Sequence, residues 1–202
     1  MAKPKSRPLL VVDVETTGQN RFLHWMPCFA ACVVDESGAS PPSAQFLCYL
    51  QQPAGTSWDA HCSKHFWKNK KKAINGELLY DRLQRDAAQC GVWEPTVGMS
   101  RFSGWLKRMA QRYPRLQVAS DNPSYDIAWL DHYLQLYCGE QSMAYCTGEW
   151  RAVLDVRSYA AALGSTLSAE CRDHNPLSDA LQIGQEFRKL ERLYCVARGC
   201  SA

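Results

Sequence analysis

The sequence predicts an α/β fold in which a mixed five-stranded sheet is flanked by helices. Two observations predict it. Three short apolar runs with compact connections come first, and strand-like and amphipathic helical segments alternate after them. The 202 residues suffice for one domain with a substantial core, and we expect a single domain over 1–202 with its core at about 8–194. Hydrophobic residues make up 46% and charged residues 21%, a globular composition.

The first three strands are predicted at 8–14, 28–35 and 44–50. The first, Pro-Leu-Leu-Val-Val-Asp-Val, is apolar and β-branched, as expected for a strand that is buried on both faces. The connection after residue 35, Glu-Ser-Gly-Ala-Ser-Pro-Pro, is rich in helix and strand breakers. Short connections favour an antiparallel meander. Two further strands are predicted at 116–120 and 152–156.

Helices are expected where apolar residues recur at helical spacing. The segments are 58–69, 77–90, 100–112, 124–137, 157–163 and 178–194. The clearest amphipathic one, 100–112, carries Phe102, Trp105, Leu106 and Met109 on one side. We expect Ser178 to be the N-cap of the last helix, because serine is a preferred capping residue.

Neither a membrane span nor a secretory signal is predicted. No apolar run approaches the roughly 20 residues that a membrane helix needs. The apolar run after the basic N-terminus is only about five residues long, shorter than a signal peptide requires. The ten cysteines include no Cys-x-x-Cys pair, so we expect reduced thiols rather than disulfides or a structural zinc site. These features favour an intracellular protein, cytoplasmic or nuclear.

Basic residues are concentrated in one part of the chain. Residues 61–115 hold 12 of the 23 Lys and Arg but 4 of the 20 Asp and Glu, a balance of +8. We interpret about 58–112 as a basic helical insertion. Its start mixes aromatic and basic residues: His61, Lys64, His65, Phe66, Trp67, Lys68, Lys70, Lys71 and Lys72. Such a segment can stack bases and follow the phosphates of a single strand. Alternatively, Phe66 and Trp67 pack into the core while the lysines are solvated.

The first candidate site is the pair Asp13 and Glu15 at the end of the first predicted strand. Side chains alternate along a strand, so both carboxylates emerge on the same face. Two neighbouring acids repel each other and lose hydration unless a cation lies between them. Oxygen ligands suit Mg²⁺ and Mn²⁺. The alternative is a strand that simply ends at the solvent.

Two predicted helices also carry an acid in the first turn of their apolar stripe. Asp126 precedes Trp129 and Leu130 by three and four residues, so it shares their inward face. Asp179 shares a face with Ile183, Phe187, Leu190 and Tyr194. An acid in a first turn can also merely complement the helix dipole. The repeated placement predicts four carboxylates that converge at one end of a sheet.

His174 lies in a predicted loop five residues before Asp179. A lone histidine is usually structural, but beside a metal site a neutral imidazole can accept a proton from an attacking water. We therefore regard His174 as a candidate general base.

These motifs together resemble the DEDDh 3′→5′ exonucleases. The resemblance rests on Asp-x-Glu-Thr-Thr-Gly at 13–18, on Asn122-x-x-x-Asp126-x-x-x-Leu130, and on His174-x-x-x-x-Asp179, in the order of that family. It spans residues 11 to about 190. It implies an RNase H-like fold and the hydrolysis of phosphodiester bonds at the 3′ ends of single-stranded DNA or RNA.

The resemblance also assigns roles to residues. It implies that Asp13, Glu15, Asp126 and Asp179 hold two divalent cations, Mg²⁺ or Mn²⁺, and that His174 activates the water. Thr16 and Thr17 resemble positions that meet the terminal nucleotide, and Asn122 is a further candidate substrate contact. After the motif at 13–18, the family often places a side chain that wedges the last base. In this chain Phe22, Leu23, Trp25 and Met26 lie there, and ordinary packing is the alternative. The chain departs from the family at Asp121, where histidine is more usual.

Two other functions are compatible with the same residues. The first is a nucleic-acid-binding module that has kept the fold and lost catalysis, although such a module has no need for four acids and a histidine. The second is a different carboxylate–metal phosphohydrolase, although such an enzyme would not require the His-x-x-x-x-Asp element. The sequence does not decide between DNA and RNA and leaves the oligomeric state unknown.

Overall fold

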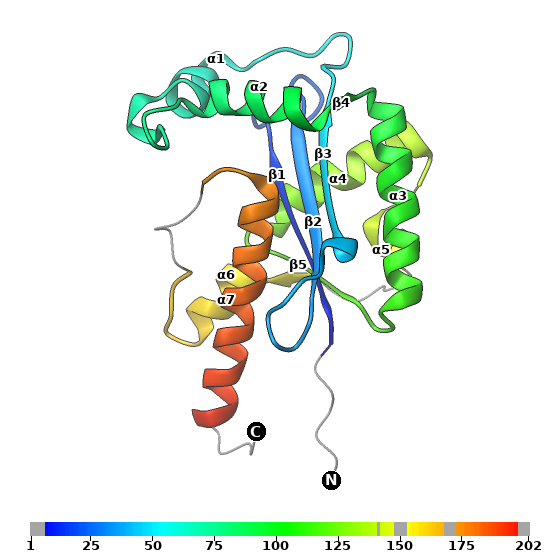
Figure 1. Cartoon of the computed structure of the whole chain (residues 1–202), viewed down its shortest axis with the longest axis vertical. Helices are drawn as coiled ribbons and strands as arrows, with labels where there is room; N and C mark the ends of the chain where they lie inside the picture. Colours follow the sequence, from blue (N-terminus) through cyan, green and yellow to red (C-terminus); the bar gives the residue numbers. More distant parts are fainter. Residues whose placement is uncertain (1–6, 141, 148–152, 168–172, 198–202) are drawn as a thin grey trace.

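The computed structural model describes residues 7–140, 142–147, 153–167 and 173–197. Figure 1 shows a central sheet with helices on both faces and a further helical layer across one end of the strands. This is the α/β architecture that the sequence predicts.

The described residues form a six-stranded mixed sheet in the order β4-β3-β2-β1-β5-β6. Its strands are β1 (Leu9–Glu15), β2 (Cys28–Val34), β3 (Gln45–Leu50), β4 (Val92–Trp93), β5 (Gln117–Ser120) and β6 (Leu154–Asp155). The first three are antiparallel, which confirms the meander. β5 runs parallel to β1, and β6 runs parallel to β5.

The prediction of five strands is corrected to six by β4. This strand has only two residues, which pair in parallel with Tyr49 and Leu50 of β3. Two residues are too few for a periodic pattern, so the sequence gives no signal for it.

The longer helices are α2 (Leu79–Cys90), α3 (Pro95–Arg112), α4 (Pro123–Cys138) and α7 (Pro176–Ala197). Shorter helical segments are η1 (Pro42–Ala44), α1 (Ala60–Cys62), the π-helical η2 (Ser63–Trp67), η3 (Lys70–Lys72), α5 (Met143–Thr147) and α6 (Val156–Ala162). Two of the long helices begin earlier than predicted because each has a proline in its first turn, Pro95 in α3 and Pro176 in α7.

The two faces of the sheet have different helical covers. α3, α4 and α5 pack on the face that holds Leu10, Val12 and Val14 of β1, and α7 packs on the face that holds Leu9 and Val11. Alternation along β1 therefore places Asp13 and Glu15 on the α7 face, at the end of the strand.

The segment between β3 and α3 forms a small core of its own. Trp67 and Leu79 pack with Leu83 of α2 and with Cys28 and Tyr49 of the sheet. This layer lies across the end of β1 and the start of β2 (Figure 1), and Asp13 and Glu15 are in the last three residues of β1. The indole Nε1 of Trp67 donates a hydrogen bond of 3.0 Å to the carbonyl of Thr16, which ties the layer to the end of β1.

α3 belongs to the main core rather than to this layer. Met99, Phe102, Trp105, Leu106 and Met109 are all buried in the large cluster on the α4 side of the sheet. The expected amphipathic face of this helix is confirmed.

No helix in the described ranges is both long enough and apolar enough to cross a membrane. The eight cysteines of this part of the chain are free thiols.

Candidate metal centre

Asp13 and Glu15 project from the end of β1 and are nearly inaccessible, each with 7% of its surface exposed. Burial raises the pKa of Asp13 well above its usual value, and the charges of Asp126, Glu15 and Asp179 raise it further. All of the predicted carboxylates therefore lie close enough to interact, as the sequence indicates.

Asp126 enters the site from the first turn of α4 and is 4% exposed. The hydroxyl of Ser120, the last residue of β5, donates a hydrogen bond to Asp126 Oδ2. The same Ser120 oxygen accepts the backbone N–H of Asn122 at 2.9 Å. Ser120 thus couples the end of β5 to the start of α4 and orients the carboxylate.

Asp179 enters from the first turn of α7 and is 2% exposed. The prediction that Ser178 is the N-cap of this helix is wrong. Asn175 Oδ1 accepts the backbone N–H groups of Leu177 and Ser178 at 3.1 and 3.3 Å. With Pro176 at the first helical position, the cap moves to the residue before the proline.

Two groups of side chains could each hold a metal ion. Glu15, His174 and Asp179 form one, and Asp13, Asp121 and Asp126 form the other. Asp13 Oδ2 is buried and has no hydrogen-bond partner among the described residues. A buried carboxylate oxygen without a donor, among other acids, has the chemistry of a ligand to a hard divalent cation.

Asp121 is the acid that the sequence motifs do not assign to the site. It follows β5 directly, and β5 lies parallel to β1, so Asp121 reaches the level of Asp13. Its carboxylate is 4% exposed and accepts a 2.6 Å ion-paired hydrogen bond from Arg157 of α6. The parallel pairing of β5 beside β1 is the signal that would have identified it.

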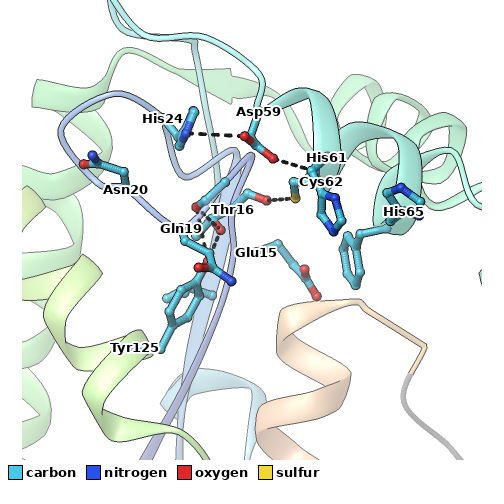
Figure 2. Close-up of a pocket in the computed structure, with 13 residues that line it drawn as sticks. Glu15, Thr16, Gln19, Asn20, His24, Asp59, His61, Cys62, His65 and Tyr125 are labelled. Atoms are coloured by element: carbon cyan, nitrogen blue, oxygen red, sulfur yellow. Dashed lines mark hydrogen bonds and ion pairs between the residues drawn. The ribbon is translucent and has the colours of Figure 1, made fainter.

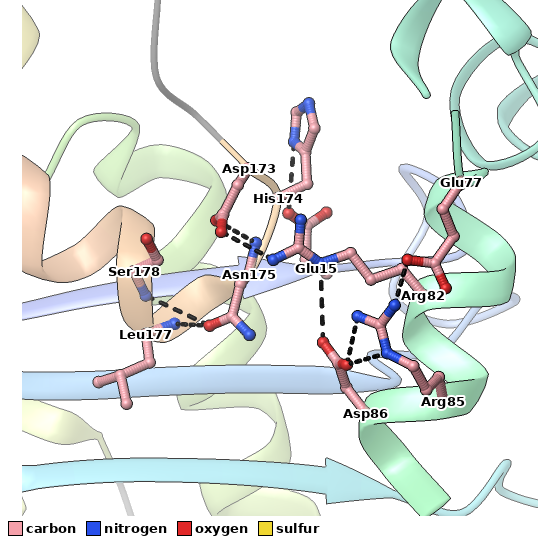
Figure 3. Close-up of polar contacts among 10 residues, drawn as sticks. All are labelled: Glu15, Glu77, Arg82, Arg85, Asp86, Asp173, His174, Asn175, Leu177 and Ser178. Atoms are coloured by element: carbon pink, nitrogen blue, oxygen red, sulfur yellow. Dashed lines mark hydrogen bonds and ion pairs between the residues drawn. The ribbon is translucent and has the colours of Figure 1, made fainter. Parts of the chain in front are cut away.

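His174 lies beside the carboxylates, as predicted. Its Nδ1 is 3.6 Å from Glu15 Oε1, and its ring makes an edge contact with Phe66 at 4.8 Å between centroids. Its backbone has a φ of 52°, in the left-handed region that non-glycine residues seldom adopt. Figure 3 shows it on the loop between Asp173 and α7.

A pocket of about 690 Å³ opens next to Glu15 (Figure 2). Its wall includes Thr16, Asn20, His24, Asp59, His61, Cys62, His65, Phe66 and Tyr125. The phenol of Tyr125 hydrogen-bonds to the hydroxyl of Thr16 and donates to the carbonyl of Gly18 at 3.3 Å. The pocket therefore joins the end of β1, the start of α4 and the α1–η2 segment.

Gly18 permits the close packing at this pocket. A Cβ atom there would lie 2.4 Å from Cδ2 of His24 and 2.7 Å from Cβ of Asp59. Because these distances are shorter than real contacts allow, glycine is needed to bring the two loops together.

Solved structures of exonucleases resemble this chain in fold. Escherichia coli exonuclease I in complex with a dT13 oligonucleotide matches 95% of this chain and 43% of its own, with a TM-score of 0.62 and 12% identity. Exonuclease I from Methylocaldum szegediense matches 96% and 43%, with a TM-score of 0.63 and 14% identity. Cell-death related nuclease 4 matches 92% and 64%, with a TM-score of 0.53 and 15% identity.

The chain has the fold of these exonucleases. It spans less than half the length of the exonuclease I chains that it matches. No protein-family model matches the sequence, and no curated protein matches it significantly. The RNase H-like exonuclease fold predicted from the motifs is confirmed, with a sixth strand.

The three candidate substrate contacts, Thr16, Thr17 and Asn122, lie in different environments. Thr16 lines the pocket. Thr17 is fully buried, and its hydroxyl accepts the backbone N–H of Trp25 at 3.0 Å and lies within hydrogen-bond distance of the carbonyls of Trp25 and Ser57. Asn122 is exposed at the start of α4, where its side chain accepts the hydroxyl of Ser124 at 3.0 Å.

Two segments, one around Phe66 and Trp67 and the other at residues 22–26, each contain both buried and exposed or pocket-lining apolar side chains. Trp67 is 1% exposed and belongs to the core, whereas its neighbour Phe66 lines the pocket. Near the pocket, Phe22 and Leu23 are 70% and 56% exposed, whereas Trp25 is buried. The packing interpretation therefore holds for Trp67 and Trp25, and contact of Phe66, Phe22 or Leu23 with a base stays a prediction.

Proposed function

We propose that this chain is a metal-dependent 3′→5′ exonuclease of the DEDDh type. It would hydrolyse phosphodiester bonds at the 3′ end of single-stranded DNA or RNA and release nucleoside 5′-monophosphates. The observation that carries the proposal is the convergence of Asp13, Glu15, Asp126, Asp179 and His174 at the end of β1, beside a pocket of about 690 Å³. The likeness to exonuclease I with bound oligonucleotide supports it.

The four acids would hold two divalent cations, Mg²⁺ or Mn²⁺. The donor set consists of carboxylate oxygens, which these hard cations prefer, and the partnerless Oδ2 of Asp13 offers one of them. When bound, such cations neutralise the charge that develops on a phosphoryl group and acidify water. Asp121 is a fifth acid within reach, and Arg157 balances its charge.

His174 would act as the general base. Its side chain is 24% exposed, enough for contact with solvent, and Glu15 lies at hydrogen-bonding range of a protonated Nδ1 after a small shift. A neutral imidazole there can accept the proton of the attacking water.

The pocket beside Glu15 would receive the terminal nucleoside. Thr16 lies on its wall at the end of β1, and the exposed Phe22 and Leu23 lie on the loop that follows. We propose direct contact for Thr16 and, at the entrance to α4, for Asn122. Thr17 would act by holding the loops through its buried hydroxyl.

The lysine segment, residues 64–72, would bind the phosphates of the strand. Lys64, Lys68, Lys70, Lys71 and Lys72 are all exposed, and Phe66 between them faces the pocket. Cationic side chains with an aromatic face between them suit a single strand. We further propose that residues 1–202 act as one exonuclease domain, and that the free thiols reflect an intracellular, reducing environment.

A time course on a 5′-labelled oligonucleotide with Mg²⁺ or Mn²⁺ tests the proposal. Stepwise shortening with release of nucleoside 5′-monophosphate is expected. Binding without shortening would instead identify a nucleic-acid-binding module, and phosphate release without shortening a different phosphohydrolase. The rates on single-stranded DNA, single-stranded RNA and duplex substrates of identical sequence then show which nucleic acid the protein prefers.

Two variants test the site assignment. Asp179→Asn should abolish turnover because a ligand is removed, and His174→Ala should lower kcat about 10²-fold or more, the usual range for a general base. Asp81→Asn, an exposed acid on α2, is the control and should retain the wild-type rate. Wild-type activity in Asp179→Asn would show that the metal site is misassigned.

A further inference from the structure

We propose that Arg82 of α2 positions His174 for catalysis through Asp173. This inference rests on the proposed function and assigns to the helical layer a role beyond binding the strand. Arg82 Nη2 is 2.8 Å from Asp173 Oδ2, and Asp173 immediately precedes His174 in the chain. Figure 3 shows this ion pair between α2 and the histidine loop.

Arg82 has a second carboxylate nearby on its own helix, although its Nε forms no hydrogen bond among the described residues. Its Nε lies 3.7 Å from Asp86 Oδ2, one helical turn later, and its side chain is only 18% exposed. The other oxygen of Asp86 accepts two hydrogen bonds from Arg85, at 3.1 and 2.8 Å. Because the guanidinium of Arg82 is largely shielded from water, its ion pair with Asp173 is screened less than a fully solvated pair.

Asp173 transmits this contact to both sides of the site. Its Oδ1 accepts the backbone N–H of Asn175 at 3.1 Å, while its Oδ2 binds Arg82. Asn175 in turn caps α7, because its side-chain oxygen accepts the backbone N–H groups of Leu177 and Ser178. Asp179 lies in the first turn of that helix. One aspartate thus connects α2 to the histidine loop and to the start of α7.

The backbone of His174 needs such support. At a φ of 52° a histidine is in a sparsely populated conformation, which persists where neighbouring contacts determine it. The contacts are the Arg82–Asp173 pair before it, the Asn175 cap after it, and the edge of Phe66 against its ring. Arg82, Leu83 and Asp86 also line one crevice with His174, Asn175 and Pro176.

Arg82 is therefore a positioning residue. It reaches no carboxylate of the metal centre in the described contacts, and its effect on the reaction passes through the loop that carries the general base. A displacement of about 1 Å at a catalytic group can lower a rate as much as 10²-fold.

The experiment compares Arg82→Ala and Asp173→Asn with the control Arg85→Ala in the full chain. Asp173→Asn retains an oxygen for the N–H of Asn175, so it removes the ion pair with Arg82 and leaves the turn intact. Among the described residues Arg85 pairs with Glu77 and Asp86, so its variant tests the general loss of a cation from α2. Far-UV circular dichroism and thermal melting confirm folding.

In steady-state assays, Arg82→Ala and Asp173→Asn should lower kcat about 10- to 100-fold with KM unchanged, and Arg85→Ala should match the wild type. Arg82→Lys, which keeps the charge and loses the planar fork, should recover part of the loss. In a His174→Ala background, Arg82→Ala should cause no further loss. A further loss of the same size, or a rise in KM alone, would overturn the proposal.

Hydrogen exchange separates this inference from the proposed function. The amides of residues 173–179 should exchange faster in Arg82→Ala than in Arg85→Ala, whether or not the protein degrades oligonucleotides. If exchange is identical in the two variants, the positioning role is wrong even if the exonuclease is active. If exchange differs and no variant shortens any oligonucleotide, the proposed function is wrong and the structural contact stands.

Discussion

Asp13 is the residue at which folding and the proposed metal binding make opposing demands. Its carboxylate is buried among other acids, and one oxygen lacks a hydrogen-bond partner in the described part of the chain. Both burial and the neighbouring charges raise its pKa. The folded protein therefore binds a proton at Asp13 more tightly than the unfolded chain does.

This difference determines how the free energy of unfolding changes with pH. The stability contributed by a protonated Asp13 is fully present below the pKa of the unfolded chain, near the ordinary value of 3.8, and is lost as the pH rises through the raised pKa of the folded state. Asp13→Asn mimics the protonated carboxyl without titrating. In EDTA at pH 8 this variant should melt about 2–4 °C above the wild type, as expected for roughly 1 kcal/mol in a chain of this size.

Melting curves in EDTA at pH 5 and pH 8 check this prediction, and the difference should widen with pH. Asp121→Asn is the matched control: its acid is equally buried but paired with Arg157, so the variant should gain no stability. Mg²⁺ should raise the melting temperature of the wild type more than that of Asp13→Asn. A wild type more stable than Asp13→Asn in EDTA at pH 8 would contradict the argument.

The four predicted carboxylates could be located from the sequence because each occupies a recognisable position in a periodic strand or helix. Asp13 and Glu15 end an apolar strand, and Asp126 and Asp179 start the apolar stripes of helices. Asp121 could not be assigned in this way, because its place beside Asp13 depends on which strand is the neighbour of β1. The role of Arg82 could not be predicted either, because its partner Asp173 is 91 residues away in the sequence.

Among the elements, α7 carries Asp179 and is fixed to the sheet by a buried arginine. Arg188 is 2% exposed. Its Nε donates to the carbonyl of Asp35 at 2.9 Å, its Nη2 to the carbonyl of Arg7, and its Nη1 to Glu191 at 2.5 Å. A single guanidinium thus joins the helix to the chain before β1 and the chain after β2.

Arg188→Met should destabilise the protein by about 2–4 kcal/mol, because buried carbonyl groups lose charged donors that no solvent replaces. Urea denaturation followed by fluorescence measures the change. Lys189→Met, at the exposed neighbouring position, is the control and should change the free energy of unfolding little. Equal stability of the two variants would show that Arg188 is not an anchor.

Long elements with strong periodicity are predictable from the sequence, and their ends are less so. The β-branched runs of β1 to β3 and the apolar stripes of α3, α4 and α7 locate these elements within a few residues. The starts of α3 and α7 lie earlier than their apolar patterns indicate, because proline is tolerated in a first turn and both helices begin with one, Pro95 and Pro176. The α1–η2 segment is short and irregular, and its arrangement depends on the burial of Trp67 against the end of β1.

At the scale of the whole molecule, positive charge and the acidic centre lie on adjacent elements. The lysine segment overlaps η2, whose Phe66 contacts His174. Asp13 and Glu15 lie at the end of β1, which this layer crosses. A polyanion drawn to the lysines is thereby brought to the edge of an acidic site that would otherwise repel it.

Lys70→Ala/Lys71→Ala should weaken binding of a single-stranded oligonucleotide and reduce its salt dependence. Removing one lysine–phosphate ion pair should flatten the slope of log K against log salt by about 0.7, so two lysines should change it by roughly 1.4. Fluorescence anisotropy in Ca²⁺ or EDTA between low and moderate salt measures it. Arg108→Ala/Lys189→Ala removes the same charge from α3 and α7 and should leave the slope unchanged.

The directions of β1 and α7, the first and last elements of the described chain, have a practical consequence. β1 runs towards the carboxylates, and α7 starts beside them and runs back, so Leu9 and Ala197 both lie at the opposite end of the molecule (Figure 1). An affinity tag, a surface tether or a fused protein that replaces the chain before Leu9 or after Ala197 would therefore be joined at the end of the molecule opposite the candidate metal centre. Attachment to a solid support through either one should leave oligonucleotide access unobstructed.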